Sequence, residues 1–346
     1  MKGKMIEGLY QRQLSLFQTL GTFPLPELSD CKLPDGHCSS MTPQGICVTE
    51  HYIVITAYCS MKRFKKELKA SLNTAGNQSR YDKIKNEPVH HSCLFVFSKK
   101  THVYLALLEL PDVNHVGGIA YDGKNLWVAK STENCLSVIR EQDLKKVMSD
   151  LKYSSKKEGR ISYFQKEVPC GMTASFVTYF EGRIWVGSFV SKGMHGILQS
   201  FQVQKKSEGE RKIFSLQALQ SVNIPVRANG AYFYRNVKQW TEWQKSTKKS
   251  GRRDRKIWLF VNVSGGRKKS SAVYVFQVFM KENGKISCRK VKGIRFLPPL
   301  LEEGCIDGDI LYTIYESSSP PYKDNPGNHC TFPVDVVCMA EVEKII

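Results

Sequence analysis

The chain has 346 residues, with 51 lysines and arginines against 32 aspartates and glutamates, so its formal net charge is +19. Apolar residues make up 41% and charged residues 24%, which are ordinary values for a folded protein and exclude wholesale disorder and a collagen-like chain. No stretch reaches the roughly 18 unbroken apolar residues of a membrane-spanning helix, because the best candidate, Leu94–Leu110, contains Lys99 and Lys100.

The first twenty residues have neither the continuous apolar core nor the small-residue cleavage site of a secretory signal. We therefore expect a cytoplasmic protein, and a secreted one only if the true start lies upstream. The eleven cysteines form no Cys-x-x-Cys pair, so their spacing predicts neither a zinc ribbon nor a complete disulfide framework. Reduced thiols are the expectation.

In chain order, the first strand-like segment is Arg12–Leu20, which is followed by a proline-containing stretch. Five later segments share one pattern: an apolar strand, a polar turn such as Asp-Gly or Glu-Gly, and a second strand rich in aromatic and β-branched residues. These segments are Pro43–Tyr58, His115–Ala129, Cys170–Phe189, Ala228–Asn236 with Lys256–Ser264, and Glu302–Tyr315. A third strand follows each of them, and a fourth follows all but the last.

This repeat predicts an all-β protein: one β-propeller of five blades with four antiparallel strands each. Arg12–Leu20 can supply the fourth strand of the last blade, which joins the two ends of the chain and removes an open sheet edge. Repeat glycines at 45, 117, 171, 230 and 304 are about 65 residues apart on average, so five repeats fill nearly the whole chain. The predicted blades span 43–110, 115–168, 170–224, 228–296 and 302–342, within a single domain over residues 1–346.

Three alternatives compete with this prediction. A sixth, degenerate blade could lie in Pro24–Met41 or in an insertion. A kelch propeller would place a Gly-Gly pair in every blade with a period near 50 residues, but the pair Gly117-Gly118 occurs in the second repeat alone. A β-sandwich would lack the common repeat pattern.

The segment Gly117–Val128 resembles the strand pair GI-x-x-D-G-x-L-W-V of the NHL- and lactonase-like propeller superfamily, and 45–56 and 304–313 resemble it less closely. The resemblance extends over residues 43–342 and concerns the fold. A shared fold does not imply a shared function.

Three insertions carry most of the positive charge: residues 60–88 (+5), 140–160 (+3) and 235–256 (+7), together +15 of the total +19. Apolar residues three and four apart predict helices over Lys62–Leu72 and Glu141–Leu151. The third insertion combines tryptophans, which can stack on bases, with cations that neutralise phosphates, as in a polyanion site. Its candidate residues are Trp240, Trp243, Lys248, Lys249, Arg252 and Arg253. The alternative is a solvated basic loop, and such a loop would also attract an anionic membrane surface.

Ligands of propellers usually bind where the loops entering the innermost strands converge. The residues that flank the repeat glycines are therefore the candidates for a ligand site at the mouth of the central channel: Gln44, His115, Met172, Asn229, Glu302 and Glu303, with Asp307 nearby. The lactonase-like resemblance implies carboxylates and Asn from several blades around a divalent metal, whereas here the carboxylates come from the fifth blade. His115, Glu303 and Asp307 are the candidates for catalysis, His115 because imidazole titrates near neutral pH. The alternative for His115 is a structural hydrogen bond across the channel.

A further group, His90, His91 and Cys93 with Cys59 across the first insertion, offers soft-metal ligands. Adjacent histidines in an extended segment point to opposite faces, so a metal site here is a weak prediction, and no cofactor is predicted beyond a divalent metal.

These observations favour a monomeric, non-catalytic scaffold that binds a small polar ligand or a protein partner. The alternative is a metal-dependent enzyme of the lactonase or lyase type that uses the channel-mouth residues. A third hypothesis is binding of an anionic polymer or nucleic acid through the basic insertions.

Overall fold

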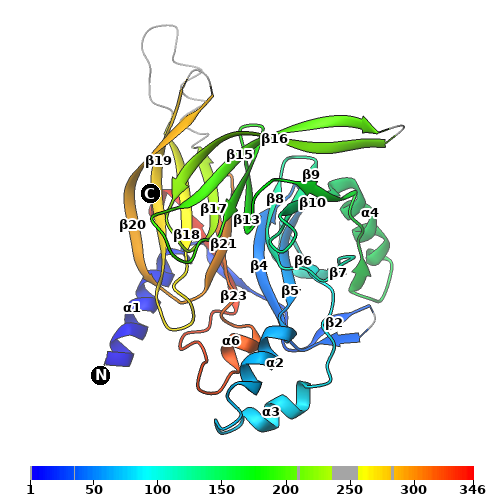
Figure 1. Ribbon diagram of the computed structural model, residues 1–346, viewed down its shortest axis with the longest axis vertical. Coiled ribbons are helices and arrows are strands. Elements are labelled where there is room, and N and C mark those ends of the chain that lie inside the picture. The colour runs from blue at the N-terminus through cyan, green and yellow to red at the C-terminus, as the bar shows by residue number, and fades with distance from the viewer. Residues whose placement is uncertain (1, 35, 209–210, 236–255, 282–283) are drawn as a thin grey trace.

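The computed structural model describes residues 2–34, 36–208, 211–235, 256–281 and 284–346, and in these residues five antiparallel sheets surround one central axis (Figure 1). The chain therefore forms a five-bladed β-propeller, as the repeat pattern predicted. In each blade the first strand in the sequence, except for the closing strand, lies innermost.

The strands follow the chain from the axis outward. Blades 1 and 2 comprise β4 (Met41–Val48), β5 (Tyr52–Cys59), β6 (Cys93–Ser98) and β7 (Tyr104–Glu109), then β8 (Val116–Tyr121), β9 (Asn125–Lys130), β10 (Cys135–Arg140) and β12 (Gln165–Pro169). Blades 3 and 4 comprise β13 (Phe176–Phe180), β14 (Arg183–Ser188), β15 (Gly196–Glu208) and β16 (Arg211–Ile224), then β17 (Ala228–Arg235), β18 (Ile257–Val263), β19 (Ser271–Met280) and β20 (Ile286–Leu297). Blade 5 comprises β21 (Leu301–Asp307), β22 (Ile310–Tyr315), β23 (Val336–Glu341) and β1 (Gly21–Pro24).

An N-terminal strand closes the ring, but it is not the predicted segment 12–20. Strand β1 pairs antiparallel with β23, in a register that places Gly21 opposite Met339 and Pro24 opposite Val336. The preceding residues form helix α1 (Lys2–Leu16). Tyr10, Leu14 and Phe17 are all buried at spacings of four and three residues, which suit one face of a helix.

Among the described residues, five hydrophobic clusters lie one between each pair of neighbouring blades, and a small sixth cluster comprises Leu300, Tyr322 and Cys330. For example, Trp127 of blade 2 packs with residues of blade 3, and Phe176 of blade 3 packs with residues of blade 4. Burial of large side chains on both faces of every blade explains why the strands read as nearly continuous apolar runs.

The first insertion forms helices α2 (Met61–Lys69) and α3 (Asn77–Ile84), which lie beside the short helix α6 (Pro320–Lys323) at one end of the view in Figure 1. A hairpin of β2 (Cys31–Leu33) and β3 (Gly36–Cys38) precedes blade 1. The second insertion forms α4 (Glu141–Lys152) and then β11 (Glu158–Arg160), which adds parallel to β7 as a fifth strand of blade 1. Residues 158–160, at the end of the second insertion, thus extend the neighbouring blade.

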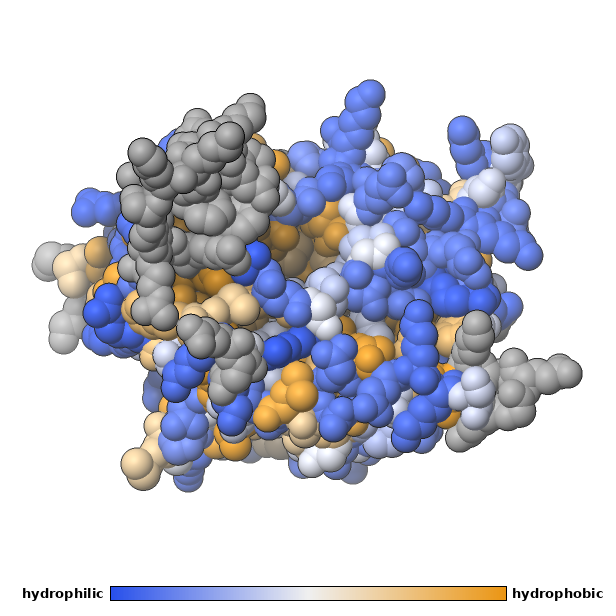
Figure 2. Space-filling model, turned by 90° about the horizontal axis from the view of Figure 1, so that it is seen from above, coloured by the Kyte–Doolittle hydropathy of each residue, from blue (hydrophilic) through white to orange (hydrophobic). Residues whose placement is uncertain are grey.

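The short helix α7 (Val342–Ile345) ends the chain. Hydrophilic side chains cover most of the face seen in Figure 2, with apolar residues in small separate patches. Among the helices that the structure describes, none is both long enough and apolar enough to cross a bilayer.

Candidate functional site

The innermost strands approach one another so closely at the axis that some of their glycine positions have no room for a side chain. A Cβ atom added to Gly45 would lie 2.6 Å from the Cα of Gly118, and one added to Gly230 would lie 2.7 Å from the Cα of Glu303. In blade 3 Phe176 occupies the position equivalent to these glycines. The repeat glycine of this blade, Gly171, lies before strand β13 and has a left-handed φ of 69°. The axis is thus closed by backbone.

The carboxylate of Glu303 lies at this closure point. Its Oε2 accepts hydrogen bonds from the backbone N–H groups of Ile46 (3.3 Å) and Ile119 (3.0 Å), and its Oε1 accepts one from Val177 (3.3 Å). One side chain of blade 5 therefore binds the inner strands of blades 1, 2 and 3. Its burial is nearly complete, and burial raises the pKa of Glu303 well above its ordinary value, against the opposing effect of the three backbone donors.

A separate polar network lies where the inner strands begin. Gln44, buried at the start of β4, donates from Nε2 to Oε2 of Glu316 at 3.0 Å and to the carbonyl of Pro43. Its Oε1 lies 2.7 Å from Nε2 of His115 and, as an amide oxygen, accepts a hydrogen bond from that nitrogen. This contact fixes the neutral histidine with its proton on Nε2 and leaves Nδ1 as an acceptor.

Blades 4 and 5 contribute the other half of this network. Asn229 donates to Oε1 of Glu302 at 2.7 Å, and the carboxyl groups of Glu302 and Glu316 are hydrogen-bonded to each other. A hydrogen bond between two carboxyl groups requires that one of them carries a proton. The backbone of Glu302 is fixed in turn, because Asn262 donates to its carbonyl at 2.6 Å.

The first insertion and the loop after β22 cover the network. Arg63 of α2 donates to the hydroxyl of Tyr322 at 2.6 Å, and Tyr322 lies close enough to Glu316 and Tyr58 to affect the pKa of both. The ring of Tyr58 packs on His115 with 4.4 Å between centroids. Blades 1, 2, 4 and 5 thus all supply side chains to one place.

Arg63 is itself held by an ion-pair chain. Its Nε binds Glu67 at 2.9 Å, and Glu67 accepts two hydrogen bonds, 2.6 and 2.7 Å long, from the buried Arg267. The guanidinium groups of Arg63 and Arg267 lie 4.9 and 4.7 Å from the centre of the Tyr322 ring. These contacts fix α2 and α6 over the network.

Burial governs the protonation of the network. It raises the pKa of Glu302 well above the ordinary value, helped by the nearby charge of Glu316, and it raises the pKa of Glu316, which Arg63 partly offsets. Burial and the charge of Arg63 lower the pKa of His115 to about 4. At neutral pH the imidazole is therefore uncharged.

Four of the predicted site residues are brought together: Gln44, His115, Asn229 and Glu302. The other three lie elsewhere. Glu303 binds backbone at the axis, Met172 packs in the cluster between blades 2 and 3, and Asp307 at the far end of β21 pairs with Lys99 at 2.7 Å.

The prediction for Met172 rested on its position next to the repeat glycine Gly171. Both residues lie before the inner strand β13, which begins at Phe176. The candidate polyanion site, Trp240 to Arg253, lies outside the described residues.

Four further residues of the network, Tyr58, Arg63, Glu316 and Tyr322, were not predicted. They come from strand ends and loops that differ from blade to blade, so the sequence repeat carries no signal for them. The one signal was Glu316 itself, which directly follows a predicted strand of the blade that also carries Glu302 and Glu303.

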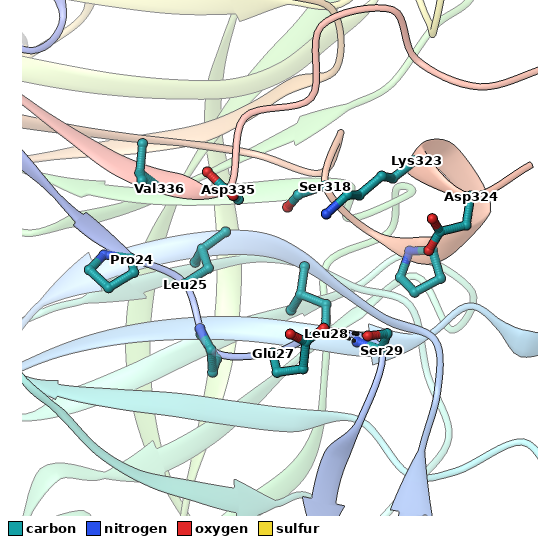
Figure 3. Close-up of a pocket in the computed structure, with 12 residues that line it drawn as sticks. Pro24, Leu25, Glu27, Leu28, Ser29, Ser318, Lys323, Asp324, Asp335 and Val336 are labelled. Atoms are coloured by element: carbon teal, nitrogen blue, oxygen red, sulfur yellow. Dashed lines mark hydrogen bonds between the residues drawn. The ribbon is translucent and has the colours of Figure 1, made fainter.

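In the part of the chain that the structure describes, three cavities flank these elements, and the one of about 350 Å³ lies against α2, α3 and α6. One of about 310 Å³ is lined by Glu27 and Ser29 on one wall and by Ser318, Lys323 and Asp324 on the other, so the loop that supplies Glu316 and Tyr322 to the network also lines this cavity (Figure 3). A smaller one of about 80 Å³ opens between the later halves of the inner strands, beyond Glu303, and is lined by residues of all five blades.

Comparison with known proteins yields no matching family model and no curated relative. Solved structures with distant similarity include the haemagglutinin-neuraminidase of parainfluenza virus 5 (10% identity, TM-score 0.37, 85% of this chain and 75% of that one) and a chain of a nidogen/laminin complex (10%, 0.36, 81% and 74%). A Bacteroides uniformis protein described as a 6-phosphogluconolactonase is another (12%, 0.32, 76% and 61%). These likenesses concern the propeller fold, and none identifies a family.

Proposed function

We propose that the protein is a non-catalytic binding propeller and that its axial polar network binds a small, uncharged, hydroxyl-rich molecule of the sugar or polyol class. The network is defined as Gln44, Tyr58, Arg63, His115, Asn229, Glu302, Glu316 and Tyr322. The observation that carries the proposal is the convergence of these side chains from four blades on one end of the axis.

The energetic cost of the network supports a role beyond folding. Two buried carboxyl groups in mutual contact each lose hydration, and their raised pKa values report that loss. Glu303 and the close packing at the axial glycines already hold the inner strands together, so a second polar layer is not needed for that purpose. Ligand-binding sites retain such costly groups because a ligand uses their hydrogen bonds.

The charges of the network favour an uncharged ligand. His115 is neutral, the two carboxyl groups share a proton, and the guanidinium of Arg63 is compensated by Glu67 and by the carboxyl pair. Amide, phenol, imidazole and carboxyl groups together offer both donors and acceptors, which suits hydroxyl groups, since each hydroxyl both donates and accepts.

The test is a panel of monosaccharides, polyols, aldonic acids and aldonolactones at millimolar concentration, scored by the melting temperature of the protein. A ligand at a hundred times its dissociation constant adds about 2.7 kcal/mol of stability, which is measurable as a shift in melting temperature. We expect a neutral polyol or sugar to raise the melting temperature of the wild type and of Asp307→Asn, the matched control carboxylate, but not that of Asn229→Ala.

A panel in which no neutral member raises the melting temperature, or in which Asn229→Ala responds like the wild type, would overturn the proposal. The lactones separate the binding protein from the enzyme. Hydrolysis of a lactone that disappears in His115→Ala would replace the proposal by the lactonase hypothesis.

A further inference from the structure

A cluster of sulfur, imidazole and carboxylate groups lies at the base of the first insertion, apart from the axial network. It is composed of Cys38 at the end of β3, Cys59 at the end of β5, and Glu87 and His90 in the segment that leads from α3 to β6. Three stretches of chain, the β2–β3 hairpin, blade 1 and the returning insertion, therefore meet at these four side chains.

The geometry of the cluster is that of a closed binding site. Ligand atoms of Cys38, Glu87 and His90 all lie within 4.8 Å of one another. Cys59 is not one of these three residues, but it interacts electrostatically with Cys38, so a second sulfur lies beside the group. Cys38 and Cys59 are 0% and 6% exposed.

The imidazole of His90 gives an independent indication. Its Nε2 is buried and has no hydrogen-bond partner among the described residues. Buried polar groups in folded proteins nearly always have a hydrogen-bond partner, so a buried nitrogen without one calls for an explanation. A ligand bound to Nε2 would supply the missing partner.

We propose that Cys38, Cys59, His90 and Glu87 form a structural zinc site. Zn²⁺ prefers four ligands in a tetrahedron drawn from thiolate, imidazole and carboxylate, and this cluster offers two sulfurs, one nitrogen and one oxygen. Binding of Zn²⁺ releases the two thiol protons to solvent and leaves the oxidation state of every atom unchanged.

Neighbouring groups orient the ligands. Ser39 donates to Glu87 twice, from its backbone N–H at 2.8 Å and from its hydroxyl at 2.6 Å. Such outer contacts are typical of metal sites, where they fix the ligand geometry.

Nearby groups of the same chemical types are engaged elsewhere, which limits the site to four ligands. His91 pairs through Nδ1 with Glu109 at 2.9 Å. Cys31 donates to the carbonyl of Glu27 at 3.0 Å, and the sulfur of Cys93 contacts that of Met41 at 3.9 Å. His90 and Cys59, noted in the sequence, thus belong to the site, whereas His91 and Cys93 do not.

Chelator-treated protein titrated with Zn²⁺ and, as a spectroscopic probe, with Co²⁺ provides the test. We expect one equivalent of Zn²⁺ to bind, the melting temperature to rise, and Co²⁺ to produce the near-ultraviolet charge-transfer absorption of thiolate ligands. Cys38→Ser and Cys59→Ser should each reduce that absorption. His90→Ala should weaken binding by more than the roughly 10–100-fold that loss of an outer contact costs.

Matched controls make the test selective. His91→Ala and Cys288→Ser replace the same residue types outside the cluster and should bind Zn²⁺ like the wild type. Because Nε2 of His90 has no partner among the described residues, His90→Ala should leave the metal-free protein as stable as before, so its loss of binding cannot be attributed to misfolding.

Three results would overturn the proposal. The first is no Zn²⁺ binding by the reduced, chelator-treated protein. The second is Co²⁺ absorption without a thiolate contribution, or one unchanged in Cys59→Ser, which would indicate adventitious metal only. The third is a mass two hydrogens lower together with no metal, which would show that Cys38 and Cys59 form a disulfide instead.

Discussion

Glu302 and Glu303 are consecutive residues of β21, yet their carboxyl groups bind entirely different partners: the first contacts Asn229 and Glu316, the second the backbone of three other blades. The two residues therefore have different roles although they are adjacent in the strand. Glu303 holds the inner strands together, and Glu302 belongs to the network that we propose binds a ligand.

The structural task of Glu303 predicts a large loss of stability on truncation. Glu303→Ala would leave three buried N–H groups without their acceptor, at about 1–3 kcal/mol each, so we expect the free energy of unfolding to fall by several kcal/mol. Urea denaturation measures this change. Asp307→Ala removes a half-exposed ion pair from the same strand and should cost at most about 1 kcal/mol. Equal losses of unfolding free energy in the two variants would contradict this structural role of Glu303.

The carboxyl pair predicts stability that decreases as the pH rises. Because burial raises the pKa of Glu302 and Glu316, the folded state binds more protons than the unfolded state at pH values above 4.5, the ordinary carboxyl pKa. The contribution of the pair is therefore fully present below that pH and is lost as the pH rises through the raised pKa values. Glu302→Gln should flatten this decrease in denaturation series at increasing pH. An unchanged slope would show that the pair does not titrate in this way.

The lowered pKa of His115 predicts the opposite pH dependence of stability in mildly acidic solution. Its pKa is lowered from 6.5 to about 4, so the unfolded state binds more protons between these values, and stability is lost as the pH falls from 6.5 to 4. The loss should approach about 3 kcal/mol, at 1.36 kcal/mol per pKa unit. His115→Gln, which does not titrate, should lack it. An NMR titration of the imidazole checks the value directly, and a midpoint near 6.5 would refute the prediction.

The close approach of the inner strands predicts that Gly45→Ala is strongly destabilising. The new methyl group would lie 2.6 Å from backbone atoms of Gly118 and Ile119, which cannot move without opening the axis. Overpacking of this kind costs about 1–3 kcal/mol or more. Gly8→Ala is the control, since nothing lies within 4 Å of its added Cβ in helix α1, where alanine is favoured. Thermal unfolding of both variants decides the matter.

The repeat pattern predicted the five blades and their closure because strand pairs with polar turns leave a strong local signal. It failed at Arg12–Leu20, where Leu14 and Leu16 alternate as in a strand but Leu14 and Phe17 are spaced as on one face of a helix, and packing against blades 4 and 5 selects the helix. The strand that closes the ring is β1, only four residues long.

The candidate site divides along the same line. Gln44, His115, Asn229 and Glu302 could be predicted because each lies one or two residues before a repeat glycine of an inner strand. Residues such as Arg63 and Tyr322 reach the network from an insertion and a loop, and Glu87 and Cys38 meet only through tertiary folding. These contacts follow no repeat in the sequence, so the repeat pattern could not predict them.

The pairing of β1 with β23 has a consequence for synthesis. Gly21 and Met339 are paired although 318 residues separate them (339 − 21), so β1 has no partner until β23 has been synthesised. Until then blades 1 to 4 can assemble as an open arc, and the ring closes only when β23 is in place. A chain that lacks β23 would keep an unpaired sheet edge, the form most exposed to aggregation and degradation.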